Sequence, residues 1–176
     1  MFCAPDQILI LALGPILEVT PKKIGCKHSE LEEVLLPLLR GRVFHVTTAA
    51  TFERICQRGW IYSTQEIDFA LTLGHSKNCY GRKRGWVSLF DLSYTTDSDI
   101  KEALIRYWFL RSIRNENTHL YLFLAESAWP SLISWKRASR EVGATEVFIP
   151  FVEAWYPGDI PIELVSDSLM VTSDPG

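Results

Sequence analysis

Apolar residues recur every three or four positions early in the chain, which predicts that the first forty residues are helical. The clearest apolar stripe covers Leu31–Leu38, and we expect Gly41 to end the helix that carries it. Ser29 and Glu32 have the spacing of a capping box, in which each side chain satisfies a free backbone amide of the first turn. Pro37 lies inside this helix and should kink its last turn, because proline has no amide hydrogen.

Three further helices are predicted by the same spacing and by residues that begin and end helices. Thr48 is expected to cap a helix that Gly59 stops. A stripe of large apolar side chains predicts a helix over 98–114, and Thr96 stands where its cap belongs. The stretch 131–142 is predicted to be the last helix, because a glycine follows it.

Short runs of β-branched, aromatic and leucine side chains predict strands between these helices. They are Val43–Val46, Trp60–Tyr62, Trp86–Phe90, Leu120–Leu124, Glu146–Phe151, Ile162–Val165 and Leu169–Val171. Helices and strands are mixed without a regular strand–helix–strand alternation. The chain is therefore expected to be an α+β protein rather than a doubly wound one.

The composition is that of an ordinary globular domain. The chain has 176 residues, of which 47% are hydrophobic and 22% charged, and this length suits one domain. The formal net charge of -3 gives no bulk attraction to nucleic acid or to an anionic membrane. The four cysteines are widely spaced and are expected to be free thiols. Cys26, His28, His75 and Cys79 have irregular spacing for metal ligands, so we expect no metal site.

The apolar run from Gln7 to Val19 bears on localisation. It is interrupted by Gly14 and Pro15 and is shorter than a membrane-spanning helix. Asp6 precedes it, where a secretory signal would carry Lys or Arg. We therefore expect a buried segment of a cytoplasmic protein with no membrane partner, and a signal sequence is the alternative.

Familiar nucleotide and catalytic motifs are not found in the sequence. It contains no GxGxxG fingerprint, no GKS/T phosphate loop, no HExxH pair and no GxSxG elbow. The usual dehydrogenase, kinase and hydrolase interpretations therefore lose their support. Three separated elements remain as candidates for chemistry: a strand ending in His45-Val46-Thr47, a glycine-bounded basic turn at 81–85, and Glu146 before an apolar run.

In this order and spacing, the three elements resemble the ADP-ribosyltransferase superfamily over about residues 42–172. The resemblance is to the branch that contains diphtheria toxin, the poly(ADP-ribose) polymerases and the DarT-type DNA-modifying toxins. It implies a split β-sheet core in a domain spanning 42–176, with residues 1–41 as a helical N-terminal extension packed on that core. It also implies a transferase that takes NAD and modifies a protein or nucleic acid, and small domains of this kind often serve as toxins or in conflicts between phage and host.

The resemblance also assigns roles to individual residues. His45 would bind the adenosine ribose of NAD, with help from Thr47, and Glu146 would be the catalytic carboxylate. Cleavage of the nicotinamide–ribose bond builds positive charge on the sugar, which a fixed carboxylate stabilises. The remaining cofactor-binding candidates are Tyr62, Tyr80, Arg82, Arg84, Ser88 and Phe90. His45 and Glu146 are expected to face one cleft, with residues 72–85 forming part of its wall.

Several alternatives stay open at this point. Many relatives carry a nicotinamide-stacking tyrosine where this chain has Ser88, which favours a catalytically inactive binding module as a second hypothesis. An RNA 2'-phosphotransferase of the same fold is a third. Glu153 is the strongest rival of Glu146 for the carboxylate role. His45 has a structural alternative as a core histidine bonded to a backbone carbonyl, and the basic turn has one as an exposed loop.

Overall fold

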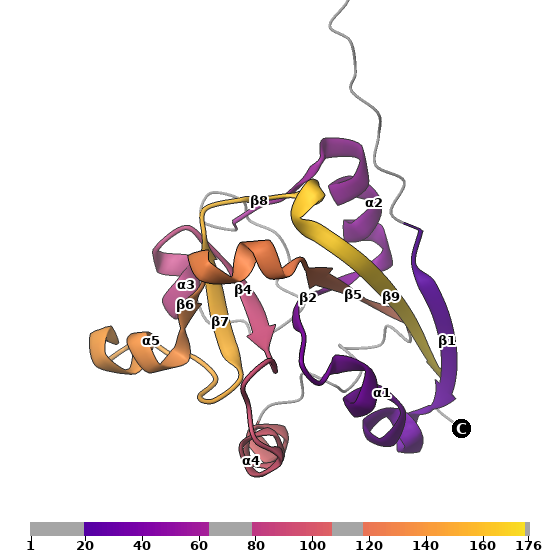
Figure 1. The fold of residues 1–176 in the computed structure, drawn as a ribbon, viewed down its shortest axis with the longest axis horizontal. Helices are drawn as coiled ribbons and strands as arrows, with labels where there is room; N and C mark the ends of the chain where they lie inside the picture. The colour runs from indigo at the N-terminus through magenta and orange to yellow at the C-terminus, as the bar shows by residue number, and fades with distance from the viewer. Residues whose placement is uncertain (1–19, 64–78, 107–117, 175–176) are drawn as a thin grey trace, which may run out of the picture.

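A seven-stranded sheet forms the centre of the protein in a computed structural model, which describes residues 20–63, 79–106 and 118–174 (Figure 1). The strand order is β1-β9-β5-β2-β4-β7-β6, and every pair is antiparallel except β1 with β9. The strands are β1 Lys22–Lys27, β2 Val43–Thr48, β4 Trp86–Asp91, β5 Thr118–Leu124, β6 Ile133–Ser134, β7 Glu153–Pro157 and β9 Val165–Asp174. Strands β3 Trp60–Ile61 and β8 Ile160–Pro161 form a separate ribbon.

Helices cover both faces of the sheet. They are α1 Leu31–Leu39, α2 Ala49–Arg58, α3 Tyr80–Lys83, α4 Asp97–Arg106 and α5 Trp135–Glu141, with 3-10 turns η1 His28–Glu30, η2 Glu126–Ser131 and η3 Ile162–Leu164. Strand alternation separates two cores: Phe44 of β2 packs with α1 and α4, whereas Val43 packs with α2 on the other face. The α+β expectation is confirmed in this form, as a mostly antiparallel sheet with several helices.

The N-terminal part differs from its prediction. Residues 22–27 form strand β1, not a helix, and Ile24 and Cys26 turn alternately toward the first core while the lysines face outward. The capping contact also differs, because Glu30 accepts the amide of Lys27 at 3.2 Å in place of the expected Ser29–Glu32 box. Helix α1 follows and buries three leucines, so the segment 20–41 belongs to the sheet and its core. Residues 1–19 lie outside the described part.

The segment that leads into β2 and α2 follows its prediction closely. Thr48 Oγ1 accepts the amide of Thr51 at 3.2 Å and caps α2. Gly59 ends the helix in the left-handed conformation, with φ 74°. Thr96 and Asp99 likewise exchange side-chain to backbone hydrogen bonds at the start of α4, of which the structure describes residues up to 106. Local signals were sufficient here, because each of these contacts joins residues three apart.

The late part of the chain corrects three predictions. The expected helix over 131–142 is divided between β6 and the shorter α5. The expected strand 146–151 is a turn segment, and the late strand begins only at Glu153. Pro150 removes a backbone donor within that segment, and Phe151 has a positive φ of 70°, so a regular strand cannot run through it. Residues 162–164 form a 3-10 turn before β9, where a strand was expected.

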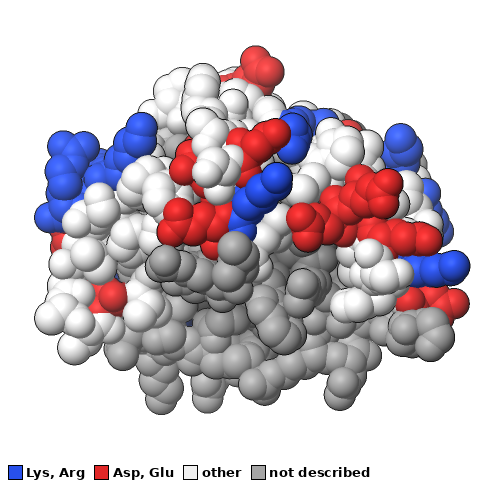
Figure 2. Space-filling view, turned by 90° about the horizontal axis from the view of Figure 1, so that it is seen from below, with Lys and Arg blue, Asp and Glu red and all other residues white. Residues whose placement is uncertain are grey.

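No helix in the described part of the chain has the length and apolar character needed to cross a membrane. Charges are mixed on the surface. The face in Figure 2 carries acidic side chains near its centre with basic ones between and beside them, and Arg40 pairs with Asp97 at 3.0 Å. This face therefore offers no continuous basic surface.

Candidate functional site

The sheet opens between its two middle strands. Strands β2 and β4 pair only at Val43 with Asp91 and at Phe44 with Phe90. Beyond Phe44, β2 continues along β5 alone, and β4 continues along β7 alone. The fork that results is the place in the described structure where two central strands separate. His45 is the first residue of β2 past the last pair with β4, so it lies at the point where the two strands begin to separate.

His45 reaches across this fork. Its Nδ1 lies 3.0 Å from the backbone oxygen of Ser88 on β4. A carbonyl oxygen only accepts, so Nδ1 carries the hydrogen and Nε2 is left as an acceptor. Burial lowers the pKa of His45 and outweighs the opposing effect of the Ser88 carbonyl, which keeps the ring neutral at pH 7. The alternative of a histidine bonded to a backbone carbonyl is thus realised, yet the residue stays partly exposed, and its Nε2 has no hydrogen-bond partner among the described residues.

The neighbouring threonine has a different environment. Thr47 lies two residues farther along β2, opposite Leu120 of β5, and is only 5% exposed. Its burial leaves Thr47 little surface for contact with a ligand.

A carboxylate lies on the other arm of the fork. Strand register pairs Ser88 with Trp155 and Phe90 with Glu153, so these four side chains share one face of β4 and β7. Ser88 is exposed, whereas Glu153 is 9% exposed and accepts the amide of Ile149 at 2.6 Å. The fork and this face meet at Ser88, whose backbone contacts His45 and whose side chain lies diagonally from Glu153.

Burial raises the pKa of Glu153 to about 7. Three groups oppose this rise: the Ile149 amide, the Ser88 hydroxyl and the Trp155 indole. The indole Nε1 is buried and makes no hydrogen bond to any described residue, so it acts on Glu153 as a nearby dipole and not as a formed bond. Glu153 also has no cation partner within the described ranges. Its carboxyl group therefore titrates near neutral pH, and its negative charge is not neutralised by a described cation.

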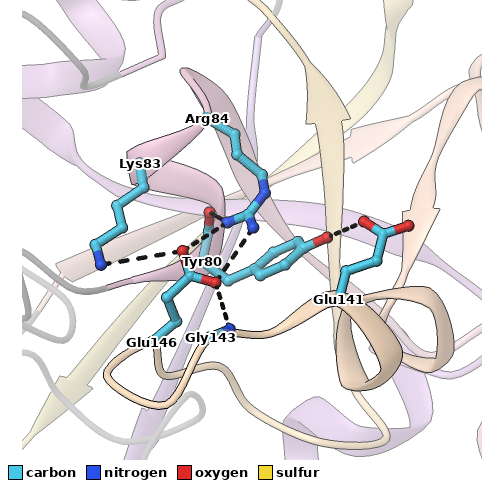
Figure 3. Close-up of polar contacts among 6 residues, drawn as sticks. All are labelled: Tyr80, Lys83, Arg84, Glu141, Gly143 and Glu146. Atoms are coloured by element: carbon cyan, nitrogen blue, oxygen red, sulfur yellow. Dashed lines mark hydrogen bonds and ion pairs between the residues drawn. The ribbon is translucent and has the colours of Figure 1, made fainter.

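Glu146 has the opposite environment (Figure 3). Its two carboxylate oxygens accept hydrogen bonds from Arg84 at 3.0 and 3.2 Å, and the Gly143 amide donates at 3.0 Å. Lys83 approaches to 4.0 Å. Arg84, followed by the Gly143 amide, holds the pKa of Glu146 below its ordinary value. The negative charge of Glu146 is therefore already neutralised by the paired donors of the Arg84 guanidinium.

Tyr80 contacts Arg84 of this ion pair with both its ring and its backbone carbonyl. The guanidinium of Arg84 lies 3.7 Å from the centre of the Tyr80 ring and donates to the Tyr80 carbonyl at 2.9 Å. The phenol donates to Glu141 at 2.8 Å, and burial raises its pKa. The ring is fully buried and lies 4.7 Å from that of Trp155. Both cofactor candidates are thus engaged within the protein: the Tyr80 phenol with Glu141, and three of the five donors of Arg84 with Glu146 and the Tyr80 carbonyl.

Helix α3 covers the face that carries Ser88 and Glu153. Gly81 lies so close to the indole of Trp155 that a side-chain carbon would come within 2.1 Å of Cδ1. Arg82 follows, and its Nη1 is buried without a hydrogen-bond partner among the described residues. Residues 79–85 of the expected cleft wall therefore lie over β4 and β7, and 72–78 fall outside the described part.

Two more candidates can be placed. The Phe90 ring lies 5.6 Å from Phe44 and is partly buried at the closed end of the fork. Tyr62 follows the separate ribbon, is 38% exposed and contacts Arg58 at 5.8 Å from its ring centre. Ser88, Phe90 and Glu153 thus share one face of the sheet, whereas His45 alternates onto the other face and contacts this group through the Ser88 backbone oxygen.

His45 and Glu146 make no hydrogen bond to each other within the described part of the chain, and each contacts the segment 84–88 at a different end. Sequence reasoning ranked Glu153 second because a strand was expected to begin at Glu146. Pro150 was the signal available in the sequence, since proline inside a run argues against a central strand.

Within the described ranges, no group of three His, Cys, Asp or Glu side chains is arranged to hold a metal ion. Cys26 lies on β1 at one edge of the sheet, and Cys79 precedes α3 toward the other (Figure 1). Comparisons with protein-family models, with curated proteins and with solved structures find nothing that matches this chain.

Proposed function

We propose that this protein is an NAD-dependent mono-ADP-ribosyltransferase that modifies a protein or a nucleic acid. The observation that carries the proposal is the fork between β2 and β4. His45 on β2 contacts the backbone of Ser88 on β4, and the neighbouring strand β7 carries the buried carboxyl group of Glu153 on the other face of the sheet. These are the elements that the family resemblance requires: a histidine strand, a strand after the basic turn, and a carboxylate at the head of a late strand.

Glu153 is the better candidate for the catalytic carboxylate on electrostatic grounds. A carboxylate stabilises a developing positive charge only when its own charge is not already compensated. Glu146 is held by two hydrogen bonds from Arg84 and by Lys83. Glu153 has no cation partner in the described structure, and it stands at the first position of β7, where Glu146 was expected to stand relative to a late strand.

The chain supplies fitting groups for NAD as substrate. The Nε2 of neutral His45 is an acceptor for a ribose hydroxyl, and the exposed Ser88 hydroxyl can both donate and accept. In the reaction the bond between the ribose carbon and the nicotinamide nitrogen breaks, and its electron pair leaves with nicotinamide. A nucleophile of the acceptor bonds to that ribose carbon. Its proton passes to Glu153 or to water, and in its charged form Glu153 stabilises the cationic sugar.

One observation favours a second candidate function. Ser88 occupies the strand position where a stacking tyrosine would hold nicotinamide. Phe90 is partly buried, and the exposed ring of Tyr62 belongs to the segment after the separate ribbon and not to β4. A domain that binds NAD or a related nucleotide without turning it over fits this arrangement. An RNA 2'-phosphotransferase finds less support, because two of the three basic residues in the turn are engaged with Glu146.

Incubation with NAD separates these functions. The transferase releases nicotinamide and NAD raises its melting temperature. The binding module gives the thermal shift alone. If the wild-type protein shows neither, both NAD hypotheses fail, and a 2'-phosphorylated RNA tested in parallel measures the third.

A further inference from the structure

The basic turn between α3 and β4 contains three cations that differ in their contacts. Arg84 donates to both oxygens of Glu146, and Lys83 lies 4.0 Å from the same carboxylate. Arg82 takes no part in this cluster. Its Nη1 has no hydrogen-bond partner among the described residues, and this atom is buried from solvent. Among the residues that the structure describes, two charges of the turn are therefore compensated by Glu146 and the charge of Arg82 is not.

A buried guanidinium nitrogen without an acceptor is costly. An arginine keeps its charge and cannot become neutral to escape this cost. Leaving a buried polar group unsatisfied costs about 1–3 kcal/mol, and more for a charged group, so native proteins retain few of them. The arrangement persists in functional sites where a ligand completes the hydrogen bonds. An anion is the ligand that matches a guanidinium in both charge and donor geometry.

Contacts of the residues beside Arg82 fix the turn that carries it. On one side, Gly81 lies against the indole of Trp155, which faces Ser88 across β4 and β7. On the other side, the Arg84–Glu146 pair fixes the end of α3, and Arg84 lies over the buried Tyr80 ring (Figure 3). Glu146 and Arg84 thus act as positioning residues for the turn, and Arg82 directly follows Gly81, which lies against Trp155 on the face that bears Ser88 and Glu153.

We propose that Arg82 binds a phosphoryl group of the dinucleotide substrate, with the Arg84–Glu146 pair holding its turn in place. This inference rests on the proposed function, since NAD carries two phosphoryl groups and no other anionic group. It also gives the two arginines of the basic turn different roles: Arg84 holds the turn through Glu146, and Arg82 binds the ligand. Guanidinium groups bind phosphoryl oxygens with paired hydrogen bonds, which an ammonium group cannot reproduce.

Direct binding tests this assignment without any turnover. Inorganic pyrophosphate and adenosine are titrated separately into wild-type protein, Arg82→Gln, Arg82→Lys and the control Arg140→Gln, with calorimetry as the readout. Arg140 is an exposed arginine on α5, so its loss changes the net charge equally. We expect Arg82→Gln to weaken pyrophosphate binding about 10- to 100-fold, as for the loss of hydrogen bonds to a charged group. The pyrophosphate affinity of Arg82→Lys should lie between those of Arg82→Gln and the wild type. Arg140→Gln should bind pyrophosphate as tightly as the wild type does.

Adenosine carries no phosphoryl group, and its affinity should be equal in all four proteins. The inference is overturned if wild-type protein does not bind pyrophosphate, if Arg82→Gln binds it normally, or if the control loses as much affinity as Arg82→Gln. Thermal unfolding of the variants without ligand shows whether Arg82→Gln is folded. If it is not, the pyrophosphate affinity of Arg82→Lys is compared with that of the wild type instead. If pyrophosphate binding depends on Arg82 but wild-type protein releases no nicotinamide from NAD, the phosphoryl site stands and the transferase proposal fails.

Discussion

Gly81 is the residue at which the packing of the site is most sensitive to a small change. A methyl group added there would lie 2.1 Å from Cδ1 and 2.5 Å from Nε1 of Trp155. Carbon atoms in good contact are about 3.5–4.0 Å apart, so the overlap is on the order of 1.5 Å. Trp155 cannot move aside, because its ring is fully buried and packs against Tyr80 at 4.7 Å. Gly81→Ala must therefore lift α3 or displace β7.

The expected loss of stability combines two opposing effects. Overpacking of this size costs about 3 kcal/mol, at the upper end of the usual range. Alanine in place of glycine in a helix returns about 1 kcal/mol. The net loss of about 2 kcal/mol corresponds to a fall in melting temperature of roughly 4–8 °C for a domain of this size. Gly81 does not have a positive φ, so close approach and not backbone strain is the cause.

Thermal unfolding followed by circular dichroism measures this effect. Gly25→Ala is the matched control, because its nearest neighbour, the Thr172 carbonyl oxygen, would lie at an ordinary 3.9 Å. We expect the control to melt at or slightly above the wild-type temperature, since alanine restricts the unfolded chain. If Gly81→Ala also melts at the wild-type temperature, α3 does not cover Trp155 as described, and the assignment of Arg82 loses its basis.

Two further predictions concern stability. Because the pKa of Glu153 rises to about 7 in the folded protein, the folded state holds a proton that the unfolded state has released, so stability should fall by roughly 3 kcal/mol between pH 4.5 and 7. Urea unfolding of Glu153→Gln should show a smaller fall over this window, and an identical pH profile in both proteins would contradict the burial of a neutral carboxyl group. Thr48→Ala should lower the melting temperature by about 2–4 °C through loss of the α2 cap, whereas Thr48→Ser keeps the hydroxyl and should restore most of it. Equal melting of the alanine and serine variants would exclude the capping contact.

The sequence predicted those parts of the fold that depend on near neighbours. The strand at His45, the cap at Thr48 and the end of α2 at Gly59 all use contacts within a few residues. The strand β1 was missed because its partner β9 lies near the other end of the chain, and nothing in a lysine-rich hexamer indicates that pairing. A short edge strand with outward lysines carries a weak hydrophobic pattern, even though its inward residues reach the core.

The catalytic carboxylate was harder to choose from sequence for the same reason. Glu146 and Glu153 both precede apolar residues, and local pattern does not separate them. What separates them is a contact between residues 62 positions apart, the Arg84–Glu146 pair, together with the strand register that places Glu153 beside Ser88. The turn at Pro150 and Phe151 decides where β7 begins, and the positive φ of Phe151 is not visible in its residue type.

The most direct test measures nicotinamide released from NAD by Glu153→Gln and Glu146→Gln side by side with the wild type. The two substitutions make the same chemical change, from a carboxyl group to an amide, at two positions with opposite electrostatic environments. We expect Glu153→Gln to lower kcat by about 100-fold or more, as for the loss of one electrostatic contact to the transition state. Glu146→Gln should lower the melting temperature while keeping kcat within several-fold of the wild type. Loss of turnover in Glu146→Gln with normal turnover in Glu153→Gln would contradict the account.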